Sequence, residues 1–448
     1  MRAELALAVE RGALADLGRA QGIGRRLVVA DAHDREAAAA LAFTSAVLAV
    51  DYGIEAGHEL EELLSRAEAS GDTDPFDPAM AMLAAARALA LLRAGDRARA
   101  ERVASAAAAA APGDPTPLYA LGRARALSGD LPGAARAFEA AIVGAPGFSA
   151  ARVAWAEAQL DLGDARTARA TLAPLVAGTP QDFRARALLD EAEVALGQAA
   201  AEPPGGACPS GRWPPPAVTA ACQLAWAGRA RRAGARDEAR TRAASAAQQA
   251  PDEPRLLART ALALAQLGAV DRAAALLTRA RRYAAPEAPW LAWARAAVTL
   301  GRGAAGASLP EGRSSDPEAR LLVARGALAA GGAGAVVPAL GEDRDLAPDA
   351  DLRALIAAGS SADAGSPAPA GDDPVRAYVA GLRAQLAGDP ARAADRFAHA
   401  LAGHGDACRA AGELNATTRT LKRRVDPVLL APLRAENAGC VNLASIRP

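Results

Sequence analysis

Apolar residues recur along most of the chain at the three- and four-residue spacing of an amphipathic helix. Glycine and proline fall between these stretches and not inside them, so each helix is expected to end where a Gly or Pro follows. Runs of Val, Ile and Thr of strand length are missing, which excludes a β-sandwich or a β-barrel. The pattern therefore predicts an all-α protein.

The helical stretches repeat with a period of 34 residues, and three residue classes keep this step. They are a turn glycine (Gly95, Gly129, Gly163), an alanine (Ala100, Ala134, Ala168) and a proline (Pro112, Pro146, Pro180). Each cycle is interpreted as two helices that are joined by a Gly-Asp turn and stopped by proline. One hairpin cannot bury its own apolar face, so the period predicts an α-solenoid of stacked helical hairpins.

The unit with the best spacing is the segment 118–146, in which Gly122 is followed by Phe138 on the second helix. This unit resembles the tetratricopeptide repeat family, although Leu118 and Arg125 stand where that family favours Trp and Tyr. The resemblance implies a superhelix of hairpins in which the first helix of each pair lines a concave groove.

The repeat signal divides the chain into blocks separated by stretches rich in Pro and Gly. Two imperfect hairpins are expected at 1–74, and regular repeat blocks at 75–197 and 217–302. The other ranges are a Pro/Gly-rich linker (198–216), degenerate helical repeats (303–359), a second linker (360–372) and a final hairpin with a C-terminal cap (373–448).

The charge balance points to protein partners. With 51 basic and 51 acidic residues, the chain has no electrostatic reason to bind nucleic acid or an anionic membrane. No apolar run is long enough for direct membrane insertion, and Glu10 and Arg11 interrupt any signal-peptide pattern. We interpret Met1 as opening inside an abbreviated first helix, which leaves room for a signal or anchor before it. All basic residues except Lys422 are arginine, a bias typical of high-GC bacterial genomes.

The four cysteines form two local pairs, Cys208 with Cys222 and Cys408 with Cys440. Each pair would join an irregular segment to a helix, so we expect two disulfide bonds, each contributing about 3 kcal/mol. This favours a periplasmic or otherwise extracytoplasmic location. The alternative is four unrelated buried thiols in a cytoplasmic protein, which the missing signal peptide favours.

Few residues are available for catalysis. The chain has four His and one Lys, and it contains no HExxH, CxxC, Walker A or GxSxG motif. We therefore expect a non-enzymatic protein with no cofactor and no metal site.

The resemblance places six residues in the concave groove, next to the packing positions of the first helices. They are Tyr119, Arg123, Glu157, Arg231, Arg259 and Trp290. Tyr, Trp and Arg often anchor interfaces, although Arg is also the default charge of this chain. The hypothesis is a scaffold that binds a segment of another protein in this groove and assists the assembly of a larger complex, with self-association possible. The alternative is an accessory subunit beside a separate enzyme such as a kinase or glycosyltransferase.

The 34-residue register makes Ala134 the small residue that faces the other helix of its hairpin. Ala134→Leu should overpack this contact and lower the free energy of unfolding by about 1–3 kcal/mol. Thermal or urea unfolding of the two proteins measures the change, and an unaltered midpoint would contradict the register.

Overall fold

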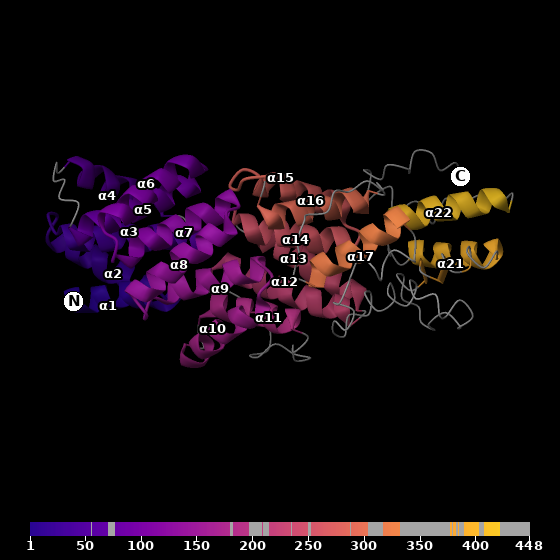
Figure 1. Cartoon of the computed structure of the whole chain (residues 1–448), viewed down its shortest axis with the longest axis horizontal. Helices are drawn as coiled ribbons and strands as arrows, with labels where there is room; N and C mark the ends of the chain where they lie inside the picture. Colours follow the sequence, from indigo (N-terminus) through magenta and orange to yellow (C-terminus); the bar gives the residue numbers. More distant parts are fainter. Residues whose placement is uncertain are drawn as a thin grey trace.

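The computed structural model describes most of residues 1–302, together with 317–331, parts of 377–402 and 407–421. The gaps within the first range are 55, 70–76, 180–181, 197–207, 209–214, 234, 250–251 and 287. The described residues form 19 helices and no strand (Figure 1). The predicted all-α fold is therefore confirmed.

The helices before residue 197 are α1 (Arg2–Arg11), α2 (Leu14–Ala30), α3 (Arg35–Tyr52), α4 (Gly57–Ala69), α5 (Pro78–Arg93), α6 (Arg97–Ala110), α7 (Pro115–Ser128), α8 (Leu131–Gly144), α9 (Ser149–Asp161), α10 (Ala165–Gly178) and α11 (Phe183–Ala195). Those that follow are α12 (Pro216–Arg232), α13 (Arg236–Gln249), α14 (Pro254–Gln266), α15 (Val270–Ala280), α16 (Pro289–Gly301), α17 (Pro317–Gly331), α21 (Pro390–Ala402) and α22 (Ala407–Thr420).

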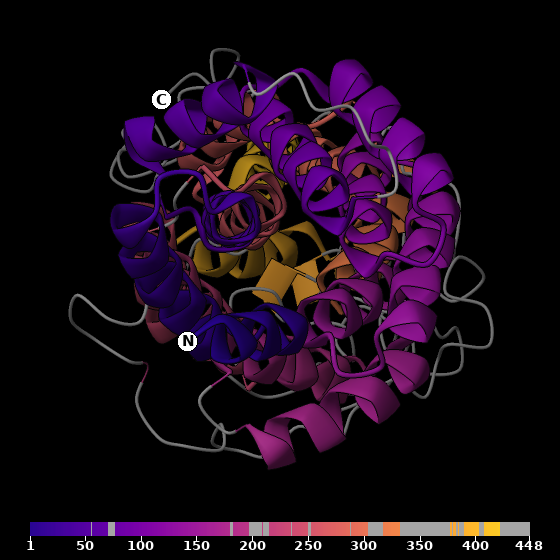
Figure 2. The ribbon, with the colours of Figure 1, turned by 90° about the vertical axis from the view of Figure 1, so that its left-hand side faces the viewer.

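The first helices of successive hairpins pack side by side and form the inner wall of a superhelix. Their order along this wall is α3, α5, α7, α9 and α11, then α12, α14 and α16. Figure 2 shows the helices of the N-terminal half curving into a ring when the molecule is viewed from one end. The α-solenoid predicted from the 34-residue period is confirmed.

Each Gly-Asp turn ends one helix and starts the next. Gly95, Gly129 and Gly163 have φ values of 85°, 90° and 91°, in the left-handed region that glycine adopts without strain. The aspartate after each glycine caps the second helix, its carboxylate accepting a backbone N–H three residues on at 2.9–3.1 Å. The Gly-Asp turns therefore determine where the second helices α6, α8 and α10 begin.

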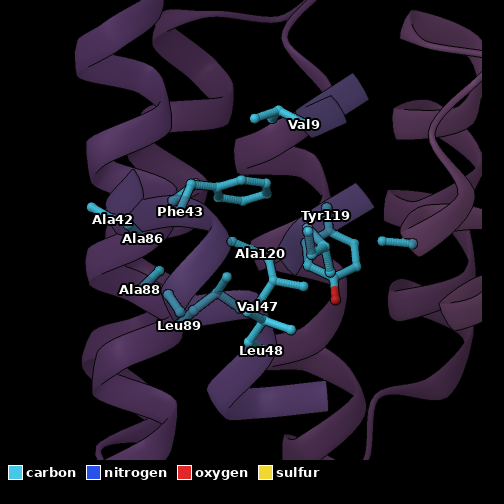
Figure 3. Close-up of a cluster of buried hydrophobic side chains, with 14 of the residues drawn as sticks. Val9, Ala42, Phe43, Val47, Leu48, Ala86, Ala88, Leu89, Tyr119 and Ala120 are labelled. Carbon is cyan, nitrogen blue, oxygen red and sulfur yellow. The ribbon is translucent and has the colours of Figure 1, made fainter. Parts of the chain in front are cut away.

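Small residues let the two helices of a hairpin approach closely. A Cβ atom on Gly122 of α7 would lie 2.4 Å from the ring of Phe138 on α8, and one on Gly381 would lie 2.6 Å from Phe397. Ala134 is also fully buried. Figure 3 shows the core on the inner side, where Tyr119 and Phe43 meet small and aliphatic side chains of α3, α5 and α7.

The second half of the superhelix contacts the first half directly. The backbone N–H of Ala285 donates to the carbonyl of Leu127 at 3.0 Å. The guanidinium of Arg93 donates to the carbonyl of Asp252 at 3.0 Å and lies over the ring of Tyr283 at 5.6 Å. The ends of α5 and α7 are therefore tied to the segments that flank α13 and α16.

The expectation that Gly and Pro lie only between helices is wrong in several helices, among them α2, α7 with Gly122, and α10. Gly18, Gly22 and Gly24 lie within α2, and Pro174 lies within α10. Pro174 is exposed, so water can satisfy the carbonyl that loses its helical hydrogen bond. Gly24 has a packing role, because a Cβ atom there would lie 3.1 Å from Cβ of Leu41.

The block boundaries taken from composition stay predictions. The linkers at 198–216 and 360–372 and the degenerate repeats at 303–359 lie mostly outside the described residues, as does the proposed cap after Leu421. No helix in the described part of the chain combines the length and apolar character that a bilayer crossing requires.

Two glycine substitutions should change stability in opposite directions. Gly122→Ala forces a methyl group against Phe138 and should destabilise the fold by about 1–3 kcal/mol. Gly18→Ala, on the open side of α2 with nothing within 4 Å, should stabilise it by up to about 1 kcal/mol through helix propensity. Urea unfolding measures both; a loss at Gly18 as large as that at Gly122 would contradict the packing.

Candidate functional site

Asp51, at the C-terminal end of α3, is a buried carboxylate on the inner wall to which side chains of two other helices bind. Its side chain is 1% exposed and accepts hydrogen bonds from the hydroxyl of Tyr119 and from Nε of Arg123, the latter at 2.7 Å. Nη1 of Arg184 lies 2.6 Å from its second oxygen. Three helices, α3, α7 and α11, thus meet at one carboxylate.

The repeat itself positions the next members. Arg123 on α7, Glu157 on α9 and Glu191 on α11 occupy the same place in successive repeats, 34 residues apart. Glu157 accepts from Arg123 and Arg184, each at 2.7 Å. The inner wall therefore carries a row of charged side chains that follows the superhelix.

Arginines of α14 complete the pairing from the second half of the chain. Nε of Arg255 donates to the two oxygens of Asp161 at 2.9 and 3.0 Å. Nη2 of Arg255 also donates to Glu191 at 3.1 Å, and Arg259 donates to the other oxygen of Glu191. The contact between the two halves is thus largely ionic at this point.

We call these eight residues the ion network: Asp51, Arg123, Glu157, Asp161, Arg184, Glu191, Arg255 and Arg259. Four carboxylates face four guanidinium groups, so the formal charges cancel. No side chain in the network is more than 22% exposed. Burial of charge is costly unless every member is paired, and here each one has an opposite charge in contact.

The environment shifts several pKa values in the network. Burial alone would raise the pKa of Glu157, but Arg184, Arg123 and Arg255 outweigh it and lower the pKa well below its usual range. At Asp161 burial outweighs the pairing with Arg255 and raises the pKa to about 6. Burial and the nearby Asp51 carboxylate raise the pKa of Tyr119, which stays a neutral hydrogen-bond donor.

A cavity of about 110 Å³ lies beside the network, between α9, α11, α12 and α14. Its lining includes charged side chains, among them Glu157, Glu191 and Arg259. The same helices also line it with apolar side chains, which are Leu188, Val194, Val218, Leu224, Leu256 and Leu262. The cavity can therefore receive an apolar side chain of a bound segment, and its charged residues can contact polar groups next to that side chain.

The structure brings five of the six predicted groove residues together. Four of them, Tyr119, Arg123, Glu157 and Arg259, belong to the network or bond directly to it, and Trp290 lines a small cavity with Arg123 and Glu157. Arg231, on α12, is 1% exposed. All six face groups of this chain, so their part in partner binding stays a prediction.

The sequence reasoning missed Asp51, Asp161, Arg184, Glu191 and Arg255. The repeat carried a signal for Glu191, which follows Glu157 by one period. Asp51 comes from an irregular hairpin and Arg255 from the second block, so neither shares the register of Arg123.

The structure describes both cysteines of one predicted pair and only one cysteine of the other. The sulfurs of Cys208 and Cys222 are bonded, with Cα atoms 5.7 Å apart, which joins Cys208 to the second turn of α12. Cys408 lies in α22, but Cys440 lies outside the described residues, so that bridge stays a prediction. Within the described residues, no group of three or more His, Cys, Asp or Glu side chains is arranged to hold a metal ion.

Stacked helical hairpins with a 34-residue period and a charged inner wall define an α-solenoid repeat protein. The sequence model of the tetratricopeptide repeat family matches residues 125–192, from the end of α7 into α11. This segment therefore consists of tetratricopeptide repeats.

Among solved structures, a chain of the structure of Naa15/Naa10 bound to HypK-THB is 13% identical to this protein. The alignment covers 91% of this chain and 70% of that chain, with a TM-score of 0.28. A superposition of that quality carries no information on function. No curated protein matches the sequence significantly.

Removing one charge from the network should be far more costly than removing one from the surface. Glu157→Gln leaves Arg123 and Arg184 short of a buried partner and should lower the free energy of unfolding by about 3–5 kcal/mol. The matched control is Glu59→Gln, which breaks the exposed pair with Arg25 and should cost less than about 1 kcal/mol. Equal losses in urea unfolding would contradict the role of the network.

The same variant should change the response to acid. The pKa of Glu157 is lower in the folded protein than in the unfolded one, so its stabilising contribution is present above about pH 4.5 and is lost as the pH falls further. The stability difference between wild type and Glu157→Gln should therefore shrink below about pH 4.5. Unfolding curves between pH 7 and pH 3 test this.

Proposed function

We propose that this α-solenoid protein is a non-enzymatic scaffold that binds a segment of another protein on its inner wall and assists the assembly of a larger complex. The observation that carries the proposal is the cavity between α9, α11, α12 and α14. It lies at the end of the row formed by Arg123, Glu157 and Glu191, where the repeat array meets the second half of the chain.

The size of the cavity favours an anchor side chain over a whole small molecule. Sites for small-molecule ligands typically enclose about 300–1,000 Å³, whereas this cavity has about 110 Å³. An aliphatic or aromatic anchor would contact Leu188, Leu224 and Leu256. Burial of such an anchor is the usual source of affinity at protein interfaces.

The charged residues of the cavity lining would orient the bound segment. Arg259 is the most exposed member of the ion network at 22%, and it lines the cavity beside Glu191. Polar groups that flank the anchor in a partner would meet this pair. The rest of the network is filled by the chain's own contacts, so we place partner binding at the cavity and not along the whole row.

Site-specific photo-crosslinking tests the proposal. A photoreactive phenylalanine analogue is placed at Ala225, which lines the cavity on α12, and at Ala109, which is exposed on the outer helix α6. A protein cross-linked from position 225 and not from position 109, in extracts of the source organism, is the expected result. If the captured protein is an enzyme, the scaffold acts as its accessory subunit.

A cavity-filling variant completes the test. Ala221→Leu, on the cavity side of α12, should reduce the yield of the cross-linked partner by about tenfold through loss of anchor burial. The control Ala109→Leu should leave the yield unchanged, and circular dichroism should show both variants to be folded. Equal cross-linking from positions 225 and 109 would refute binding at the cavity.

A further inference from the structure

The carboxylates of the ion network differ in how many guanidinium groups contact them. Glu157 is contacted by three of these groups, and Asp51 and Glu191 by two each. Among the described residues, the one cation in contact with Asp161, at the C-terminal end of α9, is Arg255. Arg255 also contacts Glu157 and Glu191, so three carboxylates share its charge. Asp161 is therefore the least neutralised carboxylate of the network.

A fifth carboxylate stands beside the network at the start of α14. Glu253 caps this helix, and its oxygens accept the backbone N–H groups of Arg255 at 3.1 Å and of Leu256 at 2.5 Å. It lines one small pocket together with Asp161, Glu157 and Arg255. The charges of the ion network cancel among themselves, so Glu253 adds one negative charge in excess between α9 and α14.

The charged groups around Asp161 come from the inner helices. They are Glu157 of α9 itself, Arg123 of α7, Glu191 of α11, and Glu253 and Arg255 at the start of α14. The outer helices α8 and α10, which also pack on α9, carry exposed charged side chains: Arg136, Glu139, Arg166 and Arg169. The end of α1 lies at the opposite end of α9, beside Ala150. The inner helices therefore set the electrostatic environment of Asp161.

This environment favours the protonated form of Asp161. Burial raises its pKa, the pairing with Arg255 opposes this, and Glu157 and Glu191 add to it, so that the pKa is about 6. The side chain is 12% exposed, and the pocket of about 30 Å³ beside it has room for water, so a proton from solvent can reach it. The protonated carboxyl can then donate to a carboxylate of the same pocket, Glu157 or Glu253.

We propose that Asp161 is a proton-binding site where the two halves of the superhelix meet, and that proton uptake there in mildly acidic solution stabilises the folded chain. The bound proton cancels the excess negative charge around Arg255. The folded protein binds this proton more tightly than the unfolded chain does, because aspartate in an unfolded chain titrates near pH 3.9. The contribution of Asp161 to stability therefore rises as the pH falls from about 7 to about 5, opposite in sign to the contribution of Glu157 at lower pH. The proposal goes beyond the scaffold function and does not depend on it, since it concerns pairing within the chain.

Urea unfolding at pH 7 and at pH 5 tests the proposal with Asp161→Asn, whose side chain has the same shape and does not titrate. Relative to this variant, the unfolding equilibrium constant of the wild type should fall about tenfold between pH 7 and pH 5. The matched control is Asp164→Asn, three residues further on. Asp164 is exposed and its hydrogen bonds with Thr167 lower its pKa, so the stability difference from wild type should stay constant over this range. A constant difference for Asp161→Asn as well would overturn the proposal.

Carbon NMR of the full chain, labelled with ¹³C in aspartate, measures the site directly. The Cγ resonance of Asp161 is identified by its absence from Asp161→Asn or, should that variant not fold, from Asp161→Glu. Its midpoint should lie near pH 6, and a midpoint close to the ordinary value of about 3.9 would refute the proposal.

A second variant tests whether the excess charge is the cause. Glu253→Gln removes the additional carboxylate, so the midpoint of Asp161 should move to lower pH. An unmoved midpoint would contradict the role of the excess charge. If the stability gain between pH 7 and pH 5 persists in Asp161→Asn and is lost in Glu253→Gln, the proton resides on Glu253, and the assignment to Asp161 is wrong.

Discussion

Close approach of two helices over a residue without a side chain is the contact on which this architecture depends. The ring of Phe138 occupies the space that a Cβ atom of Gly122 would take, and Phe397 does the same at Gly381. A chain with only 3% aromatic residues has few large side chains for a thick core, so apolar burial must come from short distances between helices. The superhelix is the result of repeating this contact in one direction.

The inner wall follows from that repetition. Because each hairpin has the same geometry, Arg123, Glu157 and Glu191 stand in one row and come within reach of neighbouring charges. The pairing across repeats is net neutral, and buried ion pairs of this kind are weak evidence for stability. Their stronger effect is on geometry: Arg255 can satisfy Asp161 and Glu191 together only when α14 sits at one position against α9 and α11.

Two cavities lie on different parts of the inner wall and differ in character. The one beside the ion network is lined by both charged and apolar side chains and is bounded by α11, α12 and α14. The one beside α1 is lined mainly by apolar side chains, with Glu10, Glu36 and Asp114 among the polar ones.

Local chemistry explains what could be predicted from the sequence. The hairpins follow from the Gly-Asp turns, since glycine accepts a positive φ and aspartate caps the next helix over a span of three residues. The groove positions of Tyr119, Arg123 and Glu157 follow from the 34-residue register. Pro174 is tolerated because water can reach the carbonyl that it frees, and Gly24 lies in α2 where it packs closely against Leu41.

The partners of those groove residues were decided by the tertiary structure. Asp51 and Arg123 are 72 residues apart, and Asp161 and Arg255 are 94 apart, so neither pair follows from a repeat of 34. They meet because the curvature of the superhelix brings α3 and α14 to the same inner wall. The sequence by itself determined the helices, their turns and the row of charged positions, because these depend on neighbours within one period. The ion pairs between distant helices and the two cavities depend on the overall curvature of the superhelix. This curvature is the sum of small rotations between successive hairpins, so it arises only when the hairpins are stacked.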